Sequence, residues 1–207
     1  MHWHQNFLTS LLNRITMYRM MLYFLIVLVV ASIIESLFGI LPYSPVDITL
    51  TALILVSVSY LANMIIARVL KAYPNLESTL ITALILSLIV GPISSLKNIV
   101  FLVLVATLAI ASKYVLAIKK HHLFNPAALG AVLSALTLGQ SASWWVGSME
   151  MNILVALGGF LILAKIKRFT LAGVFLATYL IPSMFFGVNP IATLIFSPLI
   201  FFTTVML

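Results

Sequence analysis

The stretch from Lys113 to Gly130 combines a run of cations with the signal for the start of a helix. It contains Lys119-Lys120-His121-His122 and then the dipeptide Asn125-Pro126. Pro suits the first position of a helix, and an Asn before it can cap the free backbone amides. Aligned amides beside cations favour an anionic ligand such as a phosphate. The alternative interpretation is an ordinary capped helix behind a cytoplasmic basic loop.

A second Asn-Pro dipeptide occurs later in the chain. The sequence from Phe124 to Leu129 is partly repeated from Val188 onward, 64 residues further on (188 minus 124). The positions of Lys and Arg indicate eight membrane spans, as described below. With eight spans, the two copies start helices on opposite sides of the membrane, as in an inverted repeat. Inverted repeats commonly direct paired helix starts towards a shared site near the membrane midplane. We therefore expect Asn125 and Asn189 to frame a cofactor or ion site; chance repetition of a common dipeptide is the competing explanation.

Few other residues suggest chemistry. Glu35 is the one acidic residue inside an apolar segment, where carboxylates often handle protons or cations; an interfacial glutamate without a role is the alternative. His121 and His122 are adjacent, which disfavours a shared metal site because they do not share a helix face. The chain has no Cys, which excludes disulfides and thiolate metal sites. It also lacks the motifs of ATPases and common hydrolases, so we expect neither a metal site nor catalytic residues of its own.

Eight apolar segments must position these residues. The chain is 63% hydrophobic and 7% charged, and its apolar runs approach the ~20 residues of a membrane-spanning helix. The third, fifth and sixth segments have about 15 residues each, which is short for a full span and typical of discontinuous or re-entrant helices. We expect one transmembrane domain over residues 1–207, an all-α polytopic bundle. Its segments are predicted at 20–41, 47–68, 77–91, 98–116, 126–139, 150–164, 169–187 and 191–207.

The positions of the cations indicate how the chain crosses the membrane, because Lys and Arg are retained in cytoplasmic loops. With eight spans, 10 of the 11 Lys and Arg residues lie on one side and Lys97 alone on the other. Both termini are then cytoplasmic in a prokaryotic plasma membrane, and Trp144 and Trp145 lie in an outer loop, where indoles suit the headgroup boundary. The net charge of +7 therefore indicates topology and not a nucleic-acid partner. Arg14 and Arg19, without a cleavage site after them, predict a retained first helix.

The block Phe124-Asn125-Pro126-Ala127, followed by Gly130, also occurs in a particular setting. Lys113-Tyr114 and Lys119-Lys120 precede it, and Trp144 or Trp145 follows it. In these features, and in helix order over most of its length, the chain resembles membrane proteins of flavin-linked, ion-translocating electron-transport complexes. The members that it resembles are RnfD of the Rnf complex and NqrB of the sodium-translocating NADH:quinone reductase. The resemblance implies ten helices in two inverted halves of five, a bound flavin, and electron passage coupled to sodium or proton movement.

Two features depart from that family. Members that hold FMN covalently attach it to a Thr in a Ser-Gly-Ala-Thr motif, and the corresponding part of this chain reads Ser197-Pro198-Leu199. FMN or riboflavin would therefore be bound non-covalently. The family also continues through a Thr-Asp-Pro turn and two further helices, whereas this sequence stops at Leu207. We therefore expect a truncated 5+5 inverted repeat with discontinuous helices, and further helices or a fused NAD and flavin reductase domain beyond Leu207.

These expectations define a functional hypothesis. The chain is expected to be the membrane component of an oxidoreductase, in a flavin-linked electron-transport system that can be coupled to sodium or proton translocation. Its partners would be other membrane or flavoprotein subunits, or the fused reductase domain, together with membrane lipid. An inverted-repeat permease or channel for a small solute is the alternative. The residues expected to bind the cofactor are Lys113, Lys119, Lys120, Phe124, Asn125, Pro126, Gly130, Asn189 and Ser197.

Overall fold

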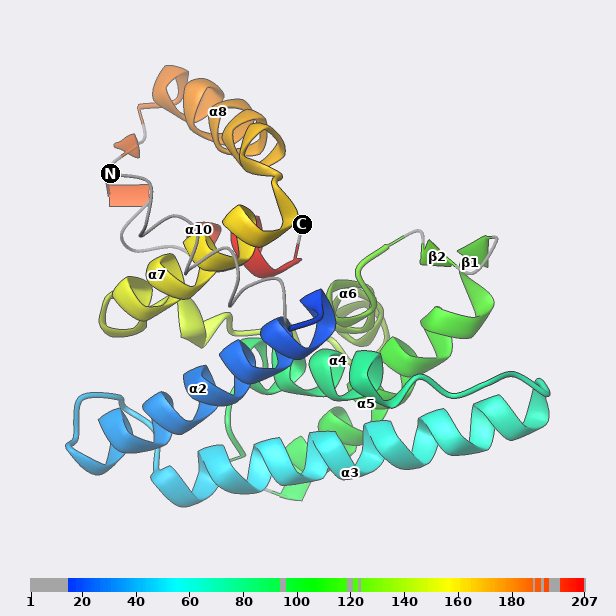
Figure 1. The fold of residues 1–207 in the computed structure, drawn as a ribbon. Helices are drawn as coiled ribbons and strands as arrows, with labels where there is room; N and C mark the ends of the chain where they lie inside the picture. The colour runs from blue at the N-terminus through cyan, green and yellow to red at the C-terminus, as the bar shows by residue number, and fades with distance from the viewer. Residues whose placement is uncertain are drawn as a thin grey trace.

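The computed structural model of the chain consists of packed α-helices and one small hairpin (Figure 1). It describes residues 15–206 apart from 94–95, 119–120, 123, 188, 191 and 194–197. The longer helices in that part of the chain are α2 (Met17–Leu37), α3 (Pro45–Val69), α4 (Leu76–Ile89), α5 (Leu96–Val115), α6 (Pro126–Leu138), α7 (Met149–Ile166) and α8 (Phe169–Phe185). The short elements are strands β1 (Ala117–Ile118) and β2 (His121–His122), the 3-10 turn η1 (Trp145–Gly147), the single turn α10 (Leu199–Phe201) and the π-helical turn η2 (Phe202–Met206).

Capping residues explain where several helices begin and end. The Asn75 side chain accepts a hydrogen bond from the Ser78 amide at 3.1 Å at the start of α4. Asn125 caps α6 in the same way, with Pro126 at the first helical position. Helix α6 ends at Gly139, whose φ of 68° is the left-handed conformation that glycine adopts readily. The expectation that Asn125-Pro126 starts a helix is therefore confirmed.

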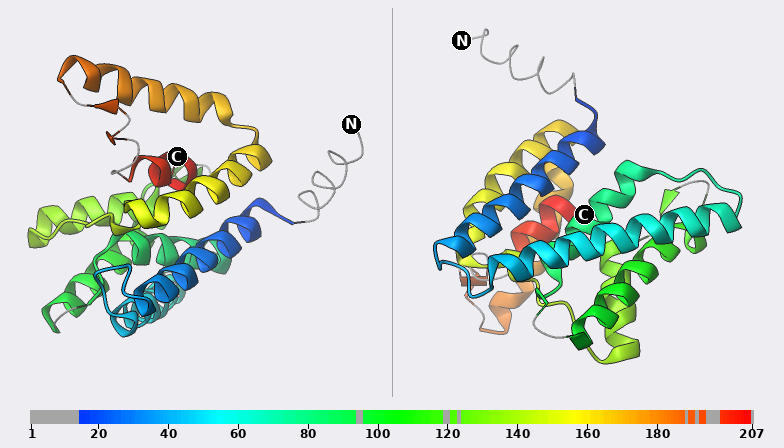
Figure 2. Two further views of the ribbon diagram at one scale, coloured as in Figure 1. Left: turned by 90° about the vertical axis from the view of Figure 1, so that its left-hand side faces the viewer. Right: turned by 90° about the horizontal axis from the view of Figure 1, so that it is seen from below.

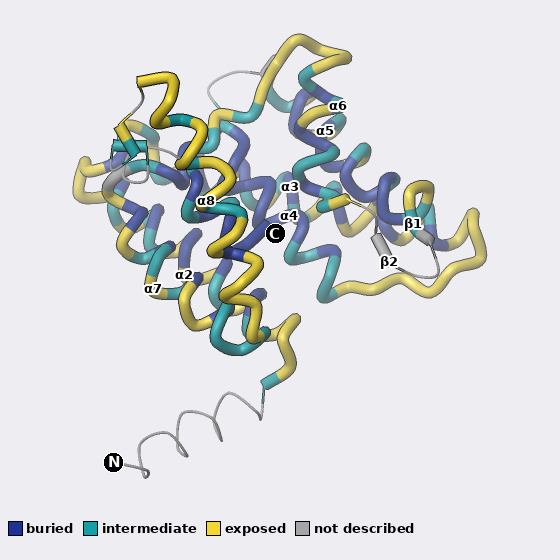
Figure 3. The backbone as a smooth tube through the Cα atoms, turned by 90° about the horizontal axis from the view of Figure 1, so that it is seen from above, coloured by how far each residue is buried: buried dark blue, intermediate teal, exposed yellow. Residues whose placement is uncertain are grey.

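Helix α4 lies at the centre of the first group of helices. It packs against α2 and α3 and also contacts α5 and α6. Residues 82–90 are all buried, and the burial colours of Figure 3 contrast this helix with the exposed trace of α8. A helix that is apolar on every side belongs in the interior of a bundle. The prediction of a short third helix buried within the bundle is confirmed.

Helix α7 and the C-terminal turns form the core of a second group, which joins the first where α7 runs beside α2 (Figure 2). Two adjacent glycines allow these close contacts. A Cβ atom at Gly158 would lie 1.9 Å from the Phe24 ring, and one at Gly159 would lie 2.5 Å from Thr204 of η2. Helix α8 is more exposed, and Ala172 is its one buried position among the described residues.

The helices differ in their ability to cross a membrane. Three are long and apolar enough by length and composition: α2, α3 and the part of α5 from Asn98 to Val115. The shorter apolar helices are α4, α6 and α8. At 14 residues, α4 is about 21 Å long, against a hydrocarbon core of about 30 Å. The expected apolar, all-helical fold is thus confirmed for the described part of the chain, while the eight spans and the inverted repeat stay predictions.

Two predicted segments differ from the structure. The sixth, expected to be short at 150–164, is an 18-residue helix. It includes Lys165 in its last turn, where a cation is favourable beside free carbonyls, and ends at Lys167 with a positive φ of 55°. The eighth, expected as one helix over 191–207, is interrupted. A new helical turn begins after Pro198 and continues as the π-helical turn η2, because Pro cannot continue an existing α-helix without losing a hydrogen bond.

Candidate functional site

Lys113 is a buried cation near the end of α5. Its side chain is 7% exposed, and its ammonium group donates to the Ser78 carbonyl at 2.7 Å and to the Ser78 hydroxyl at 3.0 Å. Burial of a charge is costly unless hydrogen bonds or an opposite charge compensate it. These two bonds tie the end of α5 to the first turn of α4. They also place a positive charge on the wall of a cavity of about 580 Å³.

The same cavity is lined by one polar residue from α3, Asn63. Asn63 is 2% exposed, and its side-chain carbonyl accepts a hydrogen bond of 2.6 Å from the Tyr114 hydroxyl. The amide nitrogen of Asn63 has no hydrogen-bond partner among the described residues. The cavity is therefore bordered by α3, α4 and α5, with tyrosines such as Tyr18 and Tyr73 beside the polar groups. Its volume falls within the range of about 300–1,000 Å³ that small-molecule sites occupy.

Asn125 has a different set of contacts. Its carbonyl oxygen accepts hydrogen bonds from the amides of Ala127 at 3.0 Å and Ala128 at 3.3 Å. Its amide nitrogen donates to the Met206 carbonyl at 3.1 Å. Asn125 is thus both the cap of α6 and a link to the C-terminal turn η2. Its hydrogen bonds go to α6 and η2, whereas those of Lys113 go to α4.

The other residues near Asn125 that were expected to bind the cofactor are described by their packing and exposure. Gly130 is buried against α5, where a Cβ would lie 2.7 Å from Ala109 and 2.8 Å from the Val105 carbonyl. Pro126 is the first residue of α6, and Phe124 is 61% exposed. The backbone before them forms the β1–β2 hairpin. The predicted binding residues Lys119, Lys120 and Ser197 lie outside the described residues.

A second cavity lies beside Pro198 and Leu199. It measures about 280 Å³ and is lined by Trp144, Phe175, Tyr179, Pro198, Leu199 and Phe202. The Phe202 ring stacks on Phe175 with centroids 5.4 Å apart and lies 6.1 Å from Trp144. These aromatic contacts come from α8, η2 and the loop before η1. They create an apolar, ring-lined space between segments that are distant in the sequence.

The tryptophan pair does not behave as the expected interfacial anchor. Trp145 is 6% exposed, and its indole nitrogen donates to the carbonyls of Val90 at 2.9 Å and Ser87 at 3.2 Å. The Trp144 amide donates to the Ile89 carbonyl at 2.8 Å. The last turn of a helix leaves carbonyl groups without helical partners, and this loop satisfies them for α4. The interpretation of both indoles as headgroup anchors was wrong for Trp145, which caps a buried helix.

Asn189 and Glu35 lie in other parts of the molecule. The Asn189 side chain accepts a hydrogen bond from the Ala192 amide at 3.3 Å, so the second Asn-Pro dipeptide also caps a helical turn. Glu35 is half-buried near the end of α2, and one of its oxygens has no hydrogen-bond partner among the described residues. Its carboxylate is repelled by that of Glu150 in the first turn of α7. A role for Glu35 in proton or cation handling stays a prediction.

Sequence reasoning missed several residues that line the two cavities. Asn63 is a polar residue within a 25-residue apolar helix, and that isolation was the available signal, since such residues tend to face the bundle interior. Ser59, one turn earlier, is also buried and its hydroxyl has no partner in the described part of the chain. Phe175 and Tyr179 carried no comparable signal, because aromatic residues are common in apolar helices.

Comparison with known proteins leaves these sites to be interpreted from their geometry. No protein-family model matches the chain, and no curated protein or solved structure shows significant similarity to it.

Proposed function

We propose that the chain is a membrane component of a flavin-linked electron-transport system, with both ends on the cytoplasmic side of a prokaryotic plasma membrane. The observation that carries the proposal is the aromatic cavity beside Pro198 and Leu199. In the resemblance, this segment aligns with the motif that carries FMN in members that bind it covalently. Phe202, stacked on Phe175, lines a space there of about 280 Å³. Aromatic rings favour stacked or edge-to-face contacts with other rings. A flavin ring could enter this space, with its polar chain left outside.

In this proposal the protein positions the flavin and adjusts its electronic properties, while the flavin supplies the redox chemistry when bound. The lining residues are nearly all apolar, so they would exclude water from the ring. The Tyr179 hydroxyl and the Trp144 indole nitrogen are polar groups on the described lining that could form hydrogen bonds to a ring nitrogen or oxygen. Electron donors and acceptors would be other membrane or flavoprotein subunits, or a fused reductase domain.

The packing of the two helix groups supports an inverted repeat. In the first group α2 packs on α3 and α4, and α3 packs on α4. In the second group α7 packs on α8 and on the C-terminal turns, and α8 packs on η2. With five helices in each half, the segment after Asn189 corresponds to α4, which is capped by Asn75. Counted in this way, the proposed repeat pairs Asn189 with Asn75 and assigns the Phe124 block to the fifth helix. The equivalence of Asn125 and Asn189 that the sequence suggested does not fit a repeat of five helices.

The proposal is tested by the visible absorption and fluorescence spectra of the protein purified from membranes in mild detergent. We expect flavin bands that persist through gel filtration, together with reduction of the flavin by dithionite. The Phe175→Ala variant should lose most of the flavin, because it removes one wall of the cavity. Phe185→Ala is the matched control, since Phe185 lies on the same helix and is 86% exposed; it should retain the flavin.

The alternative function is a permease or channel for a small solute. It is favoured by the two short helices α4 and α6, because discontinuous helices line the binding sites of many inverted-repeat transporters. A colourless protein that moves a solute across liposome membranes would support this alternative and refute the flavin proposal. Flavin retained equally by Phe175→Ala and Phe185→Ala would place the cofactor elsewhere in the molecule.

A further inference from the structure

We propose that the cavity between α3, α4 and α5 is a binding site for a phosphate group. Asn63 of α3 and Lys113 of α5 would hold this group beside the start of α4. None of the described residues lines both this site and the aromatic cavity. The inference therefore stands or falls independently of flavin binding. Three features of the described residues carry it: a buried amide donor without a partner, a buried cation without an acidic partner, and the positive end of a buried helix.

The side chain of Asn63 provides the first feature. It is 2% exposed and lines the cavity, and its amide nitrogen has no hydrogen-bond partner in the described part of the structure. The hydrogen bond from Tyr114 to the side-chain carbonyl occupies the other end of the group. A buried donor without a partner destabilises the folded state. A ligand that accepts hydrogen bonds in the cavity would remove that destabilisation.

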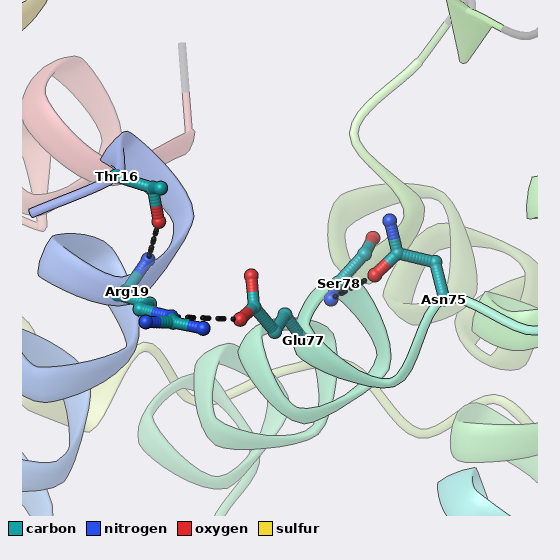
Figure 4. A network of polar contacts seen from close by, with 5 residues as sticks. All are labelled: Thr16, Arg19, Asn75, Glu77 and Ser78. Atoms are coloured by element: carbon teal, nitrogen blue, oxygen red, sulfur yellow. Dashed lines mark hydrogen bonds and ion pairs between the residues drawn. The ribbon is translucent and has the colours of Figure 1, made fainter.

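Lys113 provides the second feature. An ammonium group has three N–H donors, and two hydrogen bonds join it to Ser78. None of the described lining residues is Asp or Glu. The nearest acidic residue in sequence to Ser78 is Glu77, which pairs with Arg19 at 3.1 Å on the outside of the helix (Figure 4). A third donor is therefore available to a ligand, and the negative charge of that ligand would stabilise the ammonium form of Lys113.

The start of α4 provides the third feature. Asn75, Ser78 and Thr79 all lie in its cap and first turn and all line the cavity. The backbone dipoles of a helix place partial positive charge at this end, which favours anions. The acceptors of this part of the lining, on Asn75, Ser78 and Asn63, already receive hydrogen bonds from the protein. The Asn63 amide nitrogen and the Lys113 amino group are the donors that face a ligand, and the helix adds partial positive charge. Phosphate suits this lining because its oxygens are strong acceptors that carry negative charge.

The cavity is larger than a phosphate group alone requires. At about 580 Å³, and with Tyr18 and Tyr73 among its lining residues, it has room for the part of a molecule to which the phosphate is attached. Two sources share this chemistry. One is the headgroup of an anionic phospholipid, and the other is a soluble phosphate or phosphorylated small molecule that enters from the cytoplasmic side.

The test measures the thermal unfolding midpoint of the detergent-purified full chain with two probes: inorganic phosphate and added phosphatidylglycerol. A ligand that binds the folded state raises this midpoint in a concentration-dependent manner. Asn63→Asp is the informative variant. It keeps an oxygen to accept the Tyr114 hydrogen bond but replaces the amide donor with a carboxylate that repels phosphate. We expect its affinity for the effective probe to be at least about tenfold weaker, because a hydrogen bond to a charged group is lost.

Two further variants complete the experiment. Lys113→Gln should also lose the rise in unfolding midpoint that the effective probe causes. It replaces Asn63→Asp as the test variant if Asn63→Asp does not fold. Lys71→Gln removes an exposed cation that follows α3 and should respond like the unmodified protein, which controls for the general effect of phosphate on protein surfaces. A response to inorganic phosphate would identify a soluble ligand, and one to phosphatidylglycerol alone a lipid headgroup. The proposal is overturned if neither probe acts, or if Asn63→Asp responds like the unmodified protein.

Discussion

The amide nitrogen of Asn125 donates a hydrogen bond of 3.1 Å to the carbonyl of Met206, across 81 positions of sequence. The same side chain caps α6 through its oxygen. One residue thus stabilises both the start of a helix and its contact with η2. A residue that sequence analysis assigned to ligand binding therefore has a structural role that any mutational test must separate from binding.

Substitution of Asn125 can separate these two contributions. Asn125→Ala should lower the free energy of unfolding by about 1 kcal/mol through loss of the cap, and by roughly another 1 kcal/mol through loss of the bond to Met206. Asn125→Ser keeps a capping oxygen but has no amide nitrogen, so it should lose only the second contribution. Thermal unfolding in detergent measures the difference. Equal losses in the two variants would mean that the cap contributes little.

The close approach of α7 to η2 gives a second prediction. Gly159→Ala would bring a Cβ to 2.5 Å from Thr204, and such overpacking should cost roughly 1–3 kcal/mol. Gly173→Ala is the matched control, because a Cβ there meets nothing within 4 Å and alanine stabilises a helix interior by about 0.5–1 kcal/mol relative to glycine. Thr204→Gly combined with Gly159→Ala removes all three close side-chain atoms of Thr204 and should recover part of the loss. If the two single variants unfold at the same temperature, the packing of α7 on η2 differs from that described.

The absence of Cys from the chain makes a direct test of the proposed topology possible. Phe38, Tyr73 and Phe186 are 78%, 100% and 84% exposed. Single cysteines at positions 38 and 186 should react with a membrane-impermeant maleimide in intact spheroplasts, because eight spans place both loops outside. A cysteine at position 73 should react only after lysis. Labelling of Phe186→Cys only after lysis would show that α7 and α8 do not both cross the membrane.

The helices were largely predictable because their signals are local. Asn125-Pro126 carries its cap and its first helical residue within two positions, and the structure starts α6 there. The third segment was predicted to be short and buried because Pro and Gly limit a fully apolar run, and α4 has that character. These predictions depend on neighbouring residues only, so they need no knowledge of tertiary contacts.

The cavities could not be predicted in the same way, because each joins residues that are far apart in the sequence. Nothing near Asn63 indicates that Tyr114 will donate to its side chain across 51 positions. The Trp144-Trp145 pair has the composition of a membrane-interface anchor, yet Trp145 reaches back to the end of α4. A buried helix end requires partners for its carbonyls, and the sequence does not reveal which distant donor supplies them.

The dependence of α4 on Trp145 has a consequence for the order in which the molecule assembles. The indole that closes the end of α4 is synthesised 55 residues after Val90, after the residues of α5 and α6 have been added to the chain. Until then the last carbonyls of α4 must be satisfied by water or by the insertion machinery. Closure of the last turn of α4 is therefore a late step of biogenesis, and in a nascent chain arrested before residue 145 the carbonyls of this turn should remain hydrated.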